Sequence, residues 1–219
     1  MLYYAKFYEA NKQMKEAVDR IDAEHRKELL KFLLVKTAAV RRGVKPGELL
    51  RVRHCYETNN AEGLKICLYR SDIYGILGLD YVELKVEEGS SLVLFYDAQA
   101  LKATLAERRN RRWLERRGYP KDSALDGMIA ELRRRAQGTE LPHEVGIFVG
   151  YPLKDVAGFM AKIPATPLHN GPWRVYGDAR ESLAKMRLYR SVEEVARAVL
   201  DDSRGIDEFI EKISYRKVG

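Results

Sequence analysis

The sequence predicts an α/β fold, in which a small, mainly parallel or mixed sheet of about four to five strands is covered by helices. Short apolar runs rich in β-branched and aromatic residues alternate with longer segments of helical periodicity. Four segments also repeat one pattern, an apolar strand that runs through a tyrosine into a helix, at Tyr69, Tyr96, Tyr151 and Tyr176. If these strands are parallel, the four tyrosines lie along one edge of the sheet, which is where open α/β sheets bind ligands.

The composition indicates a globular protein. The chain has 219 residues, of which 46% are apolar and 32% charged, and this fits one α/β domain over residues 1–219. Two lobes joined near residues 118–138 are the alternative. No apolar run reaches the ~18 residues that a membrane span requires, and no secretory signal is recognisable. The expected location is therefore the cytoplasm, with no membrane partner.

The first half of the chain predicts a long helix and a strand. Residues 11–40 show helical periodicity, and the second half of this segment is apolar nearly all round, so the helix should be buried and central. Pro46 is typical of the first turn of a helix and predicts a helical turn over residues 46–51. A polar loop over 54–63, a buried strand over 64–69 and a short helix over 71–78 are expected to follow.

The second half predicts a hairpin and then mostly helices. Residues 81–86 alternate apolar and polar positions and should pair with the strand 91–96 across a turn at Gly89. The remaining predictions are helices 98–117 and 123–136 as a basic helical hairpin (98–137), strand 144–149, helix 153–162, strand 173–176 and a helical C-terminus over 179–217.

Two motifs are specific enough to carry a resemblance. They are PHEVGIFVGYPLKDVAGF at residues 142–159 and GPWRVYGD at residues 171–178. The pair resembles an uncharacterised bacterial family of anaerobic Firmicutes and relatives, catalogued as a domain of unknown function. The resemblance extends more loosely over most of the chain and implies no established activity. It does suggest one alternative function, an accessory protein that binds a partner in iron, haem or redox metabolism.

The same two motifs hold the candidate ligand site. Gly150 and Tyr151 form a sharp turn into a helix, whose free N–H groups and dipole favour an anion. Trp173 and Tyr176 either stack on a flat ligand or close the core. Asp178 has the chemistry of a helix cap. The ligand-binding candidates are His143, Glu144, Gly150, Tyr151, Asp155, Trp173, Tyr176 and Asp178.

Several kinds of chemistry find no support in the sequence. The segment HEVGI lacks the second histidine of a zinc-protease motif, because Ile147 stands in its place, so no metal site is expected. Phosphate-binding and dinucleotide-binding glycine motifs are absent, and no Ser-His-Asp or Cys-His order stands out. The two cysteines are too few for a disulfide framework. The cofactor and catalytic residues therefore stay unidentified, and the sequence does not decide whether the protein is an enzyme.

The positive charge of the chain is concentrated in one region. The net charge is +7, and residues 100–137 carry eleven Lys and Arg against five Asp and Glu, an excess of six. Arg108, Arg109 and Arg112 are candidates for binding an anion or a partner protein, or they form a solvated helix face with i,i+4 partners. Nucleic-acid binding is a further alternative, but no nucleic-acid fold signature is present. The favoured function is binding of a small anionic or aromatic ligand at strand ends.

Overall fold

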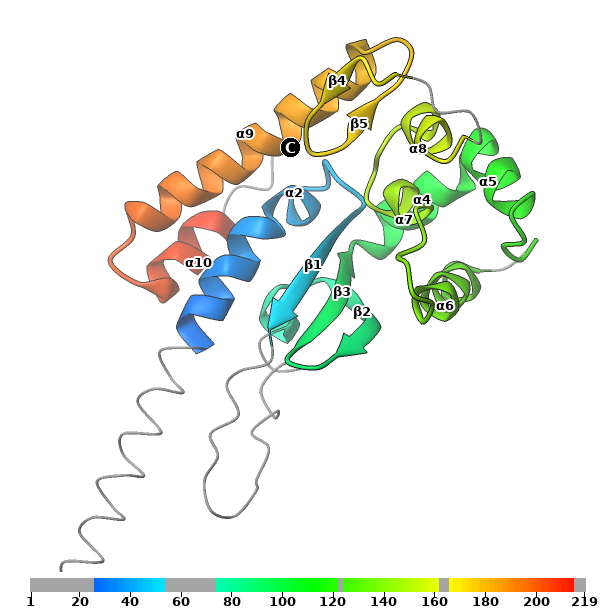
Figure 1. Ribbon diagram of the computed structural model, residues 1–219. Helices are drawn as coiled ribbons and strands as arrows, with labels where there is room; N and C mark the ends of the chain where they lie inside the picture. Colours follow the sequence, from blue (N-terminus) through cyan, green and yellow to red (C-terminus); the bar gives the residue numbers. More distant parts are fainter. Residues whose placement is uncertain (1–25, 54–73, 122–123, 162–165, 215–219) are drawn as a thin grey trace, which may run out of the picture.

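The computed structural model of the protein describes residues 26–53, 74–121, 124–161 and 166–214 (Figure 1). Its main sheet has three strands, β1 (Gly47–Arg53), β2 (Asp80–Glu87) and β3 (Ser90–Tyr96), in the order β1-β3-β2. The predicted loop 54–63, strand 64–69, Tyr69 and both cysteines lie outside the described residues.

The described strands pair antiparallel, so the predicted mainly parallel character is not found in this part of the chain. β2 and β3 form the predicted hairpin, which turns at Glu88 and Gly89, and Gly89 adopts a positive φ of 71°. A two-residue turn reverses the chain direction, and only antiparallel strands can be joined in this way. A second, small sheet pairs β4 (His169–Asn170) with β5 (Arg174–Val175).

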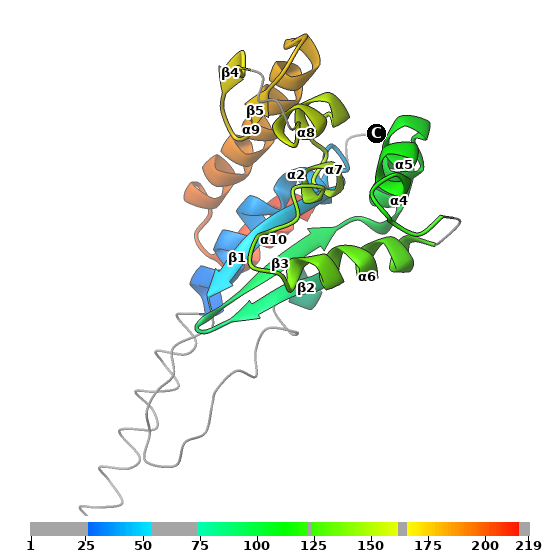
Figure 2. The same cartoon turned by 45° about the vertical axis from the view of Figure 1, so that its right-hand side comes forward.

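Helices cover both faces of the main sheet (Figure 2). β3 carries the alternation that makes this possible, because Val93 and Phe95 pack into one core while Leu94 packs into the other. The first core contains a helix over residues 26–36 with α2 (Ala38–Arg41), α9 (Arg180–Asp201) and α10 (Ile206–Ser214). The second contains α4 (Ala98–Ala106), α5 (Arg108–Glu115), α6 (Leu125–Ala136) and α7 (Val145–Phe148).

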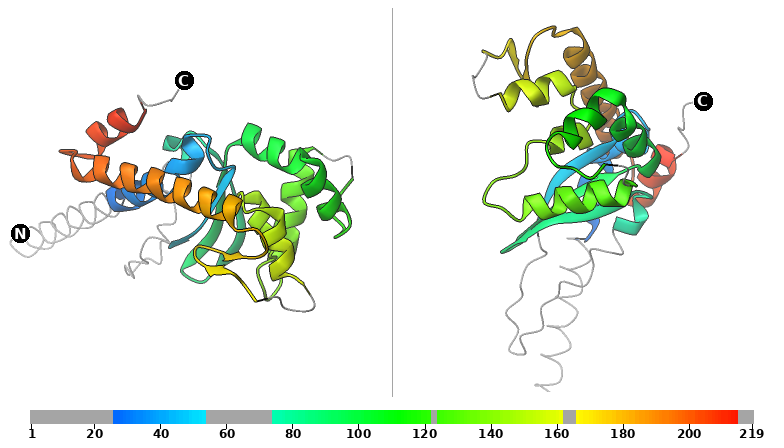
Figure 3. Two further views of the ribbon diagram at one scale, coloured as in Figure 1. Left: turned by 90° about the horizontal axis from the view of Figure 1, so that it is seen from above. Right: turned by 90° about the vertical axis from the view of Figure 1, so that its right-hand side faces the viewer.

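The layered arrangement confirms two of the predicted features. The described part of the N-terminal helix is buried, with Leu33 and Leu34 fully inside the first core, and the C-terminal region is helical (Figure 3). The left view of Figure 3 shows α9 running along the molecule from the β4–β5 hairpin towards α10. Among the described helices, none has both the length and the apolar character needed to cross a bilayer.

Two local predictions are wrong. Residues 46–51 do not form a helical turn, because Gly47–Arg53 is strand β1, in which Leu50 and Val52 are buried while Arg51 and Arg53 are exposed. Residues 144–149 do not form a strand, because α7 occupies Val145–Phe148, and Val145, Ile147 and Phe148 all enter the second core. Consecutive residues are buried here because the core encloses this short helix on all sides.

The basic helical hairpin 98–137 contains three helices rather than two. Glu107 separates α4 from α5 with an extended ψ of 127°. The buried Asn110 fastens this corner, since its side-chain amide donates to the carbonyl of Thr104 at 2.8 Å and to the Glu107 carboxylate at 3.3 Å. This interruption turns α5 away from the line of α4.

Tyr119 supplies a first prediction. Its side chain is 2% exposed, its hydroxyl has no hydrogen-bond partner among the described residues, and the Arg135 guanidinium lies 4.5 Å from the ring centre. Tyr119→Phe removes only the unsatisfied hydroxyl, so the free energy of unfolding should rise by about 1 kcal/mol in urea denaturation. Tyr189→Phe is the control and should lower stability slightly, because its hydroxyl donates to the Gly150 carbonyl at 3.3 Å. A Tyr119→Phe protein less stable than wild type would contradict the assignment.

Candidate functional site

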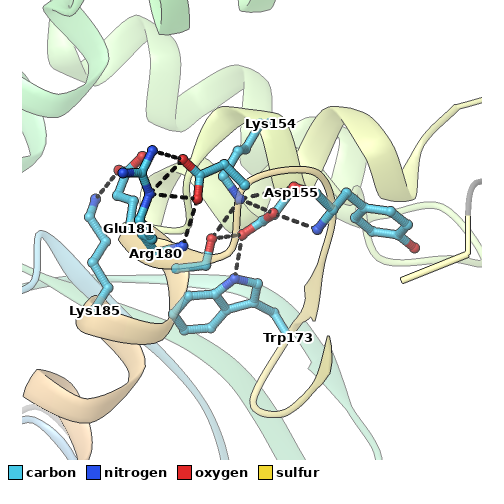
Figure 4. A network of polar contacts seen from close by, with 9 residues as sticks. Lys154, Asp155, Trp173, Arg180, Glu181 and Lys185 are labelled. Carbon is cyan, nitrogen blue, oxygen red and sulfur yellow. Dashed lines mark hydrogen bonds and ion pairs between the residues drawn. The ribbon is translucent and has the colours of Figure 1, made fainter. Parts of the chain in front are cut away.

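The buried carboxylate of Asp155 joins the two predicted motifs in space (Figure 4). Asp155 lies in the first turn of α8 (Leu153–Phe159) and is 2% exposed. Its Oδ2 accepts hydrogen bonds from the Trp173 indole N–H at 2.9 Å and from the Ser182 hydroxyl at 2.6 Å. Its Oδ1 accepts from the backbone N–H of Tyr176 at 2.9 Å. One carboxylate therefore ties α8 to the β4–β5 hairpin and to α9.

Lys154 completes this network. Its ammonium donates to Asp155 Oδ1 at 2.7 Å, to the Ser182 hydroxyl at 2.7 Å and to the Tyr176 carbonyl at 3.0 Å. Burial raises the pKa of Asp155, but the hydrogen bonds from Lys154, Ser182, Tyr176 and Trp173 outweigh it, and the net pKa lies below the usual value. Asp155 is thus ionised at neutral pH, and its charge is matched inside the protein.

Two glycines allow the surrounding elements to approach closely. A Cβ atom on Gly158 would lie 2.6 Å from the ring of Tyr176, so glycine lets the strand end pack directly on α8. Gly150 has a φ of +85°, and a Cβ atom there would lie 2.7 Å from Pro46 and 2.8 Å from the Tyr189 hydroxyl. Gly150 therefore brings the turn before α8 against both β1 and α9.

A cavity of about 480 Å3 opens beside this turn, and we call it the cationic cavity. Its basic side chains come from four places: the turn before β1, α5, α8 and α9. They are Lys45, Arg109, Lys154 and Lys185, and the acidic lining residues are Glu107 and Glu181. Tyr151 and Tyr189 add aromatic walls. Counted over the lining alone, four cations face two carboxylates, and two of the cations have carboxylate partners outside the lining.

The four cations differ in how far they are already neutralised. Lys154 is fully engaged in the Asp155 network, and Lys45 is 2.6 Å from Glu48. Lys185 contacts the Glu181 carboxylate only at 3.6 Å, and Glu181 is exposed. Arg109 is exposed and forms no ion pair within the described parts of the chain. Arg109 and Lys185 are therefore the groups with capacity to bind an added anion.

Two smaller cavities adjoin this region. The second cavity, of about 340 Å3, shares Lys45, Tyr151 and Tyr189 with the cationic cavity. The third, of about 310 Å3, is lined largely by apolar groups and includes His143 and Trp173. Tyr151 lines all three cavities, and its ring stacks on Trp173 with the ring centres 4.3 Å apart.

Three of the predicted ligand-binding residues have clear structural roles. Glu144 is buried and pairs with Arg135 at 3.3 Å. Asp178 is exposed and is not the N-cap that the sequence predicted, because Ala179 holds that position of α9; its carboxylate accepts from the backbone N–H of Arg180 at 3.0 Å from one residue earlier. Tyr176 is buried against Gly158. None of these three lines the cavities described above.

The other predicted residues are divided among the cavities. Gly150 and Tyr151 line the cationic cavity, and Asp155 and Trp173 lie together at the third. His143 is exposed at the rim of the third cavity, where its ring meets Phe159 edge-on at 4.7 Å. Of the candidate arginines, Arg109 lines the cationic cavity, whereas Arg108 and Arg112 are exposed outside it.

The predicted row of tyrosines does not form one edge. Tyr96 ends β3 and lies with α6, while Tyr151 follows helix α7 rather than a strand, and Tyr176 is buried under α8. The antiparallel pairing of β3 with both neighbours removes the premise that strand ends gather on one side. The two motifs nevertheless meet, because Asp155 links them directly.

Sequence reasoning missed Lys45, Lys185 and Tyr189. Lys45 is 7% exposed, and burial of a lysine before a strand leaves no local signal in the sequence. Lys185 and Tyr189 are four residues apart on α9, so they share a helix face, and this spacing was the available clue.

Comparison with known proteins identifies the family. No curated protein and no solved structure matched the chain. A family model described as a protein of unknown function, DUF3793, matches residues 33–210 of the 219-residue chain. The matched region contains both motifs, at 142–159 and 171–178, on which the resemblance was based. The chain therefore belongs to DUF3793, a family of proteins of unknown function.

Proposed function

We propose that the protein binds a small anionic ligand in the cationic cavity. The observation that carries the proposal is the convergence of four cationic side chains from four separate parts of the fold on one concave site. A charge run on a single helix face is ordinarily solvated, but side chains brought together by tertiary structure in a cavity act on the same bound group. A volume of about 480 Å3 suits a small molecule.

Arg109 and Lys185 are proposed as the direct anion ligands. Both have unused donors, since Arg109 lacks an ion pair within the described residues and Lys185 makes two long contacts, with the Gly150 carbonyl at 3.4 Å and with Glu181 at 3.6 Å. An arginine can hold a carboxylate or phosphate through two parallel hydrogen bonds, and a lysine adds a point charge. Lys45 and Lys154 keep their internal partners, Glu48 and Asp155, so they line the cavity but add little net charge to it.

Replacing Arg109 by alanine should weaken anion binding at least about tenfold, because a hydrogen bond to a charged group contributes ~1.5–3 kcal/mol. The measurement is isothermal titration calorimetry with inorganic phosphate and with pyrophosphate at low ionic strength. Arg108→Ala is the matched control, since Arg108 precedes Arg109 on the same helix, is exposed, and lies outside the cavity. Lack of binding to wild type, or equal losses in both variants, would overturn the proposal.

A second candidate function uses the exposed face of α5. Arg108, Arg112 and the following Arg116 are exposed and form no ion pair within the described residues, so they are free to contact nucleic acid or an acidic protein. It is the weaker proposal, because the Arg117 guanidinium lies 3.6 Å from the centre of the Trp113 ring and covers a face that a base would need. The expected result is the opposite of that for the cationic cavity. Arg108→Ala and Arg112→Ala would weaken binding of nucleic acid or an acidic protein, and this binding would depend on salt.

A further inference from the structure

The second cavity differs in character from the cationic cavity beside it. Its walls include Trp173, Met186, Tyr189 and Pro172, which are flat or apolar groups from the β4–β5 hairpin and α9. Trp173 is held in a fixed orientation, because Asp155 accepts its N–H and Tyr151 stacks on its ring. Because Tyr151 covers one face of Trp173, which is 8% exposed, a planar ring would meet the exposed part of Trp173 together with Tyr189 and Met186.

The charged groups of the second cavity are mostly satisfied within the protein. Glu193 accepts from Lys36 at 2.6 Å and from Arg197 at 3.3 Å, and Lys45 pairs with Glu48. In contrast, Arg190 and Glu194 are exposed and form no hydrogen bond or ion pair by their side chains within the described residues. The rim therefore offers one free donor group and one free acceptor group next to the apolar wall.

The junction between the two cavities carries hydrogen-bond donors. Lys45, Tyr151 and Tyr189 line both cavities. Burial raises the pKa of the Tyr151 and Tyr189 hydroxyls to about 12, with a smaller effect from nearby acidic groups such as Glu48. Both phenols stay protonated at neutral pH. The Tyr189 hydroxyl donates to the Gly150 carbonyl at 3.3 Å and Lys45 pairs with Glu48, whereas the Tyr151 hydroxyl forms no hydrogen bond within the described residues. A ligand with an acceptor between its anionic group and its ring therefore matches the Tyr151 hydroxyl at this junction.

We infer that one ligand occupies both cavities, with an anionic group in the cationic cavity and a planar ring in the second. The ligand class is thus a ring-bearing phosphate or carboxylate. This inference rests on the proposed anion binding and extends it, since the cationic cavity alone does not call for a ring. The two cavities, of about 480 and 340 Å3, adjoin at their three shared lining residues, and each is large enough for one part of such a molecule.

The test compares naphthyl phosphate with inorganic phosphate by calorimetry on the full chain. The ring should tighten binding by at least about tenfold, because it transfers apolar surface from water to the wall around Trp173. Glu194→Trp places bulk in the second cavity from an exposed position and should abolish the gain from the ring while leaving phosphate binding unchanged. Arg187→Trp is the matched control, because Arg187 is exposed on the same helix and lines none of the three cavities.

Each outcome decides between the two proposals. Two results would overturn the two-cavity inference and leave anion binding standing. Wild type could bind naphthyl phosphate and phosphate with equal affinity, or Glu194→Trp could still bind naphthyl phosphate more tightly than phosphate. Binding of both compounds without dependence on Arg109, or binding of neither, would remove the anion site and the inference with it. If both tryptophan variants lost the tighter binding of naphthyl phosphate, this would also count against the second cavity, because Glu194 lines it and Arg187 does not.

Discussion

Replacing Asp155 by alanine is expected to lower the free energy of unfolding by about 3 kcal/mol and to release the β4–β5 hairpin from α8. The carboxylate is the shared acceptor for the Trp173 indole, the Ser182 hydroxyl and the Tyr176 backbone N–H, and all three residues are buried. Without it, these three donors lose their acceptor at once, and the Lys154 ammonium loses its carboxylate while keeping Ser182 and the Tyr176 carbonyl. The measurement is urea denaturation followed by tryptophan fluorescence, in which Trp173 reports on the hairpin.

Asp178→Ala is the control for this experiment. Asp178 is an acidic residue of the second motif, as Asp155 is of the first, but its carboxylate is exposed and, among the described residues, bonds only to Arg180. Its loss should therefore have a much smaller effect on stability. Equal stability changes in the two variants would show that the Asp155 network does not hold the hairpin.

The same network predicts a loss of stability in acid. The pKa of Asp155 is lowered in the folded protein, so its contribution is complete above the unfolded pKa of ~3.9 and disappears as the pH falls through the folded value. Stability should therefore fall below about pH 4. Asp155→Asn should be less stable than wild type at neutral pH. Between about pH 5 and about pH 2, a range that includes the unfolded pKa of the carboxyl, the variant should lose less stability than wild type.

Replacing Arg135 by alanine is the second substitution with a large expected effect, a loss of about 3 kcal/mol. The Arg135 guanidinium donates to the Arg117 carbonyl at 2.6 Å and to Glu131 at 2.7 Å, and it pairs with the buried Glu144 at 3.3 Å. It also covers the ring of Tyr119. Its removal leaves Glu144 as a buried charge without its cation. Thermal or urea denaturation measures the change.

Arg134→Ala provides the contrast with Arg135. Arg134 makes two hydrogen bonds to Glu131 at 2.8 Å and is the first cause of the low Glu131 pKa of about 2. Its side chain is 70% exposed, however, so water replaces it easily and the pair stabilises the fold little. If Arg134→Ala were the more damaging change, the buried pair would not be the stabilising contact.

Elements whose residue pattern is local in the sequence could be predicted. The β2–β3 hairpin followed from alternating residues around Gly89, and the burial of the N-terminal helix followed from its apolar circumference. Strand β1 was missed because Pro46 suggested a helix start, although the alternation of Leu50 and Val52 with Arg51 and Arg53 was present. Helix α7 was missed because a short apolar run such as VGIFV fits a buried strand and a buried helix equally well.

The candidate site was predictable only in part, and for a physical reason. The motifs identified the turn at Gly150 and Tyr151 and the stretch from Trp173, and the structure brings these together. Which partner each polar group chooses depends on tertiary contacts. Asp155 bonds to Ser182, 27 positions away, and Glu144 is neutralised by Arg135 from a different helix. Sequence spacing encodes neither contact.

Helix α9 has a mechanical consequence. Its 22 residues span about 33 Å, which makes it a stiff rod rather than a local support. Near its beginning, Leu183 and Met186 pack with the hairpin, and near its end, Ala196 and Val199 pack in the core beneath the main sheet. A tilt of α9 at the hairpin would therefore also move its other end, which packs in the first core against α10 through Phe209. One continuous helix, rather than a loop, therefore joins the packing around the hairpin to the packing of the first core.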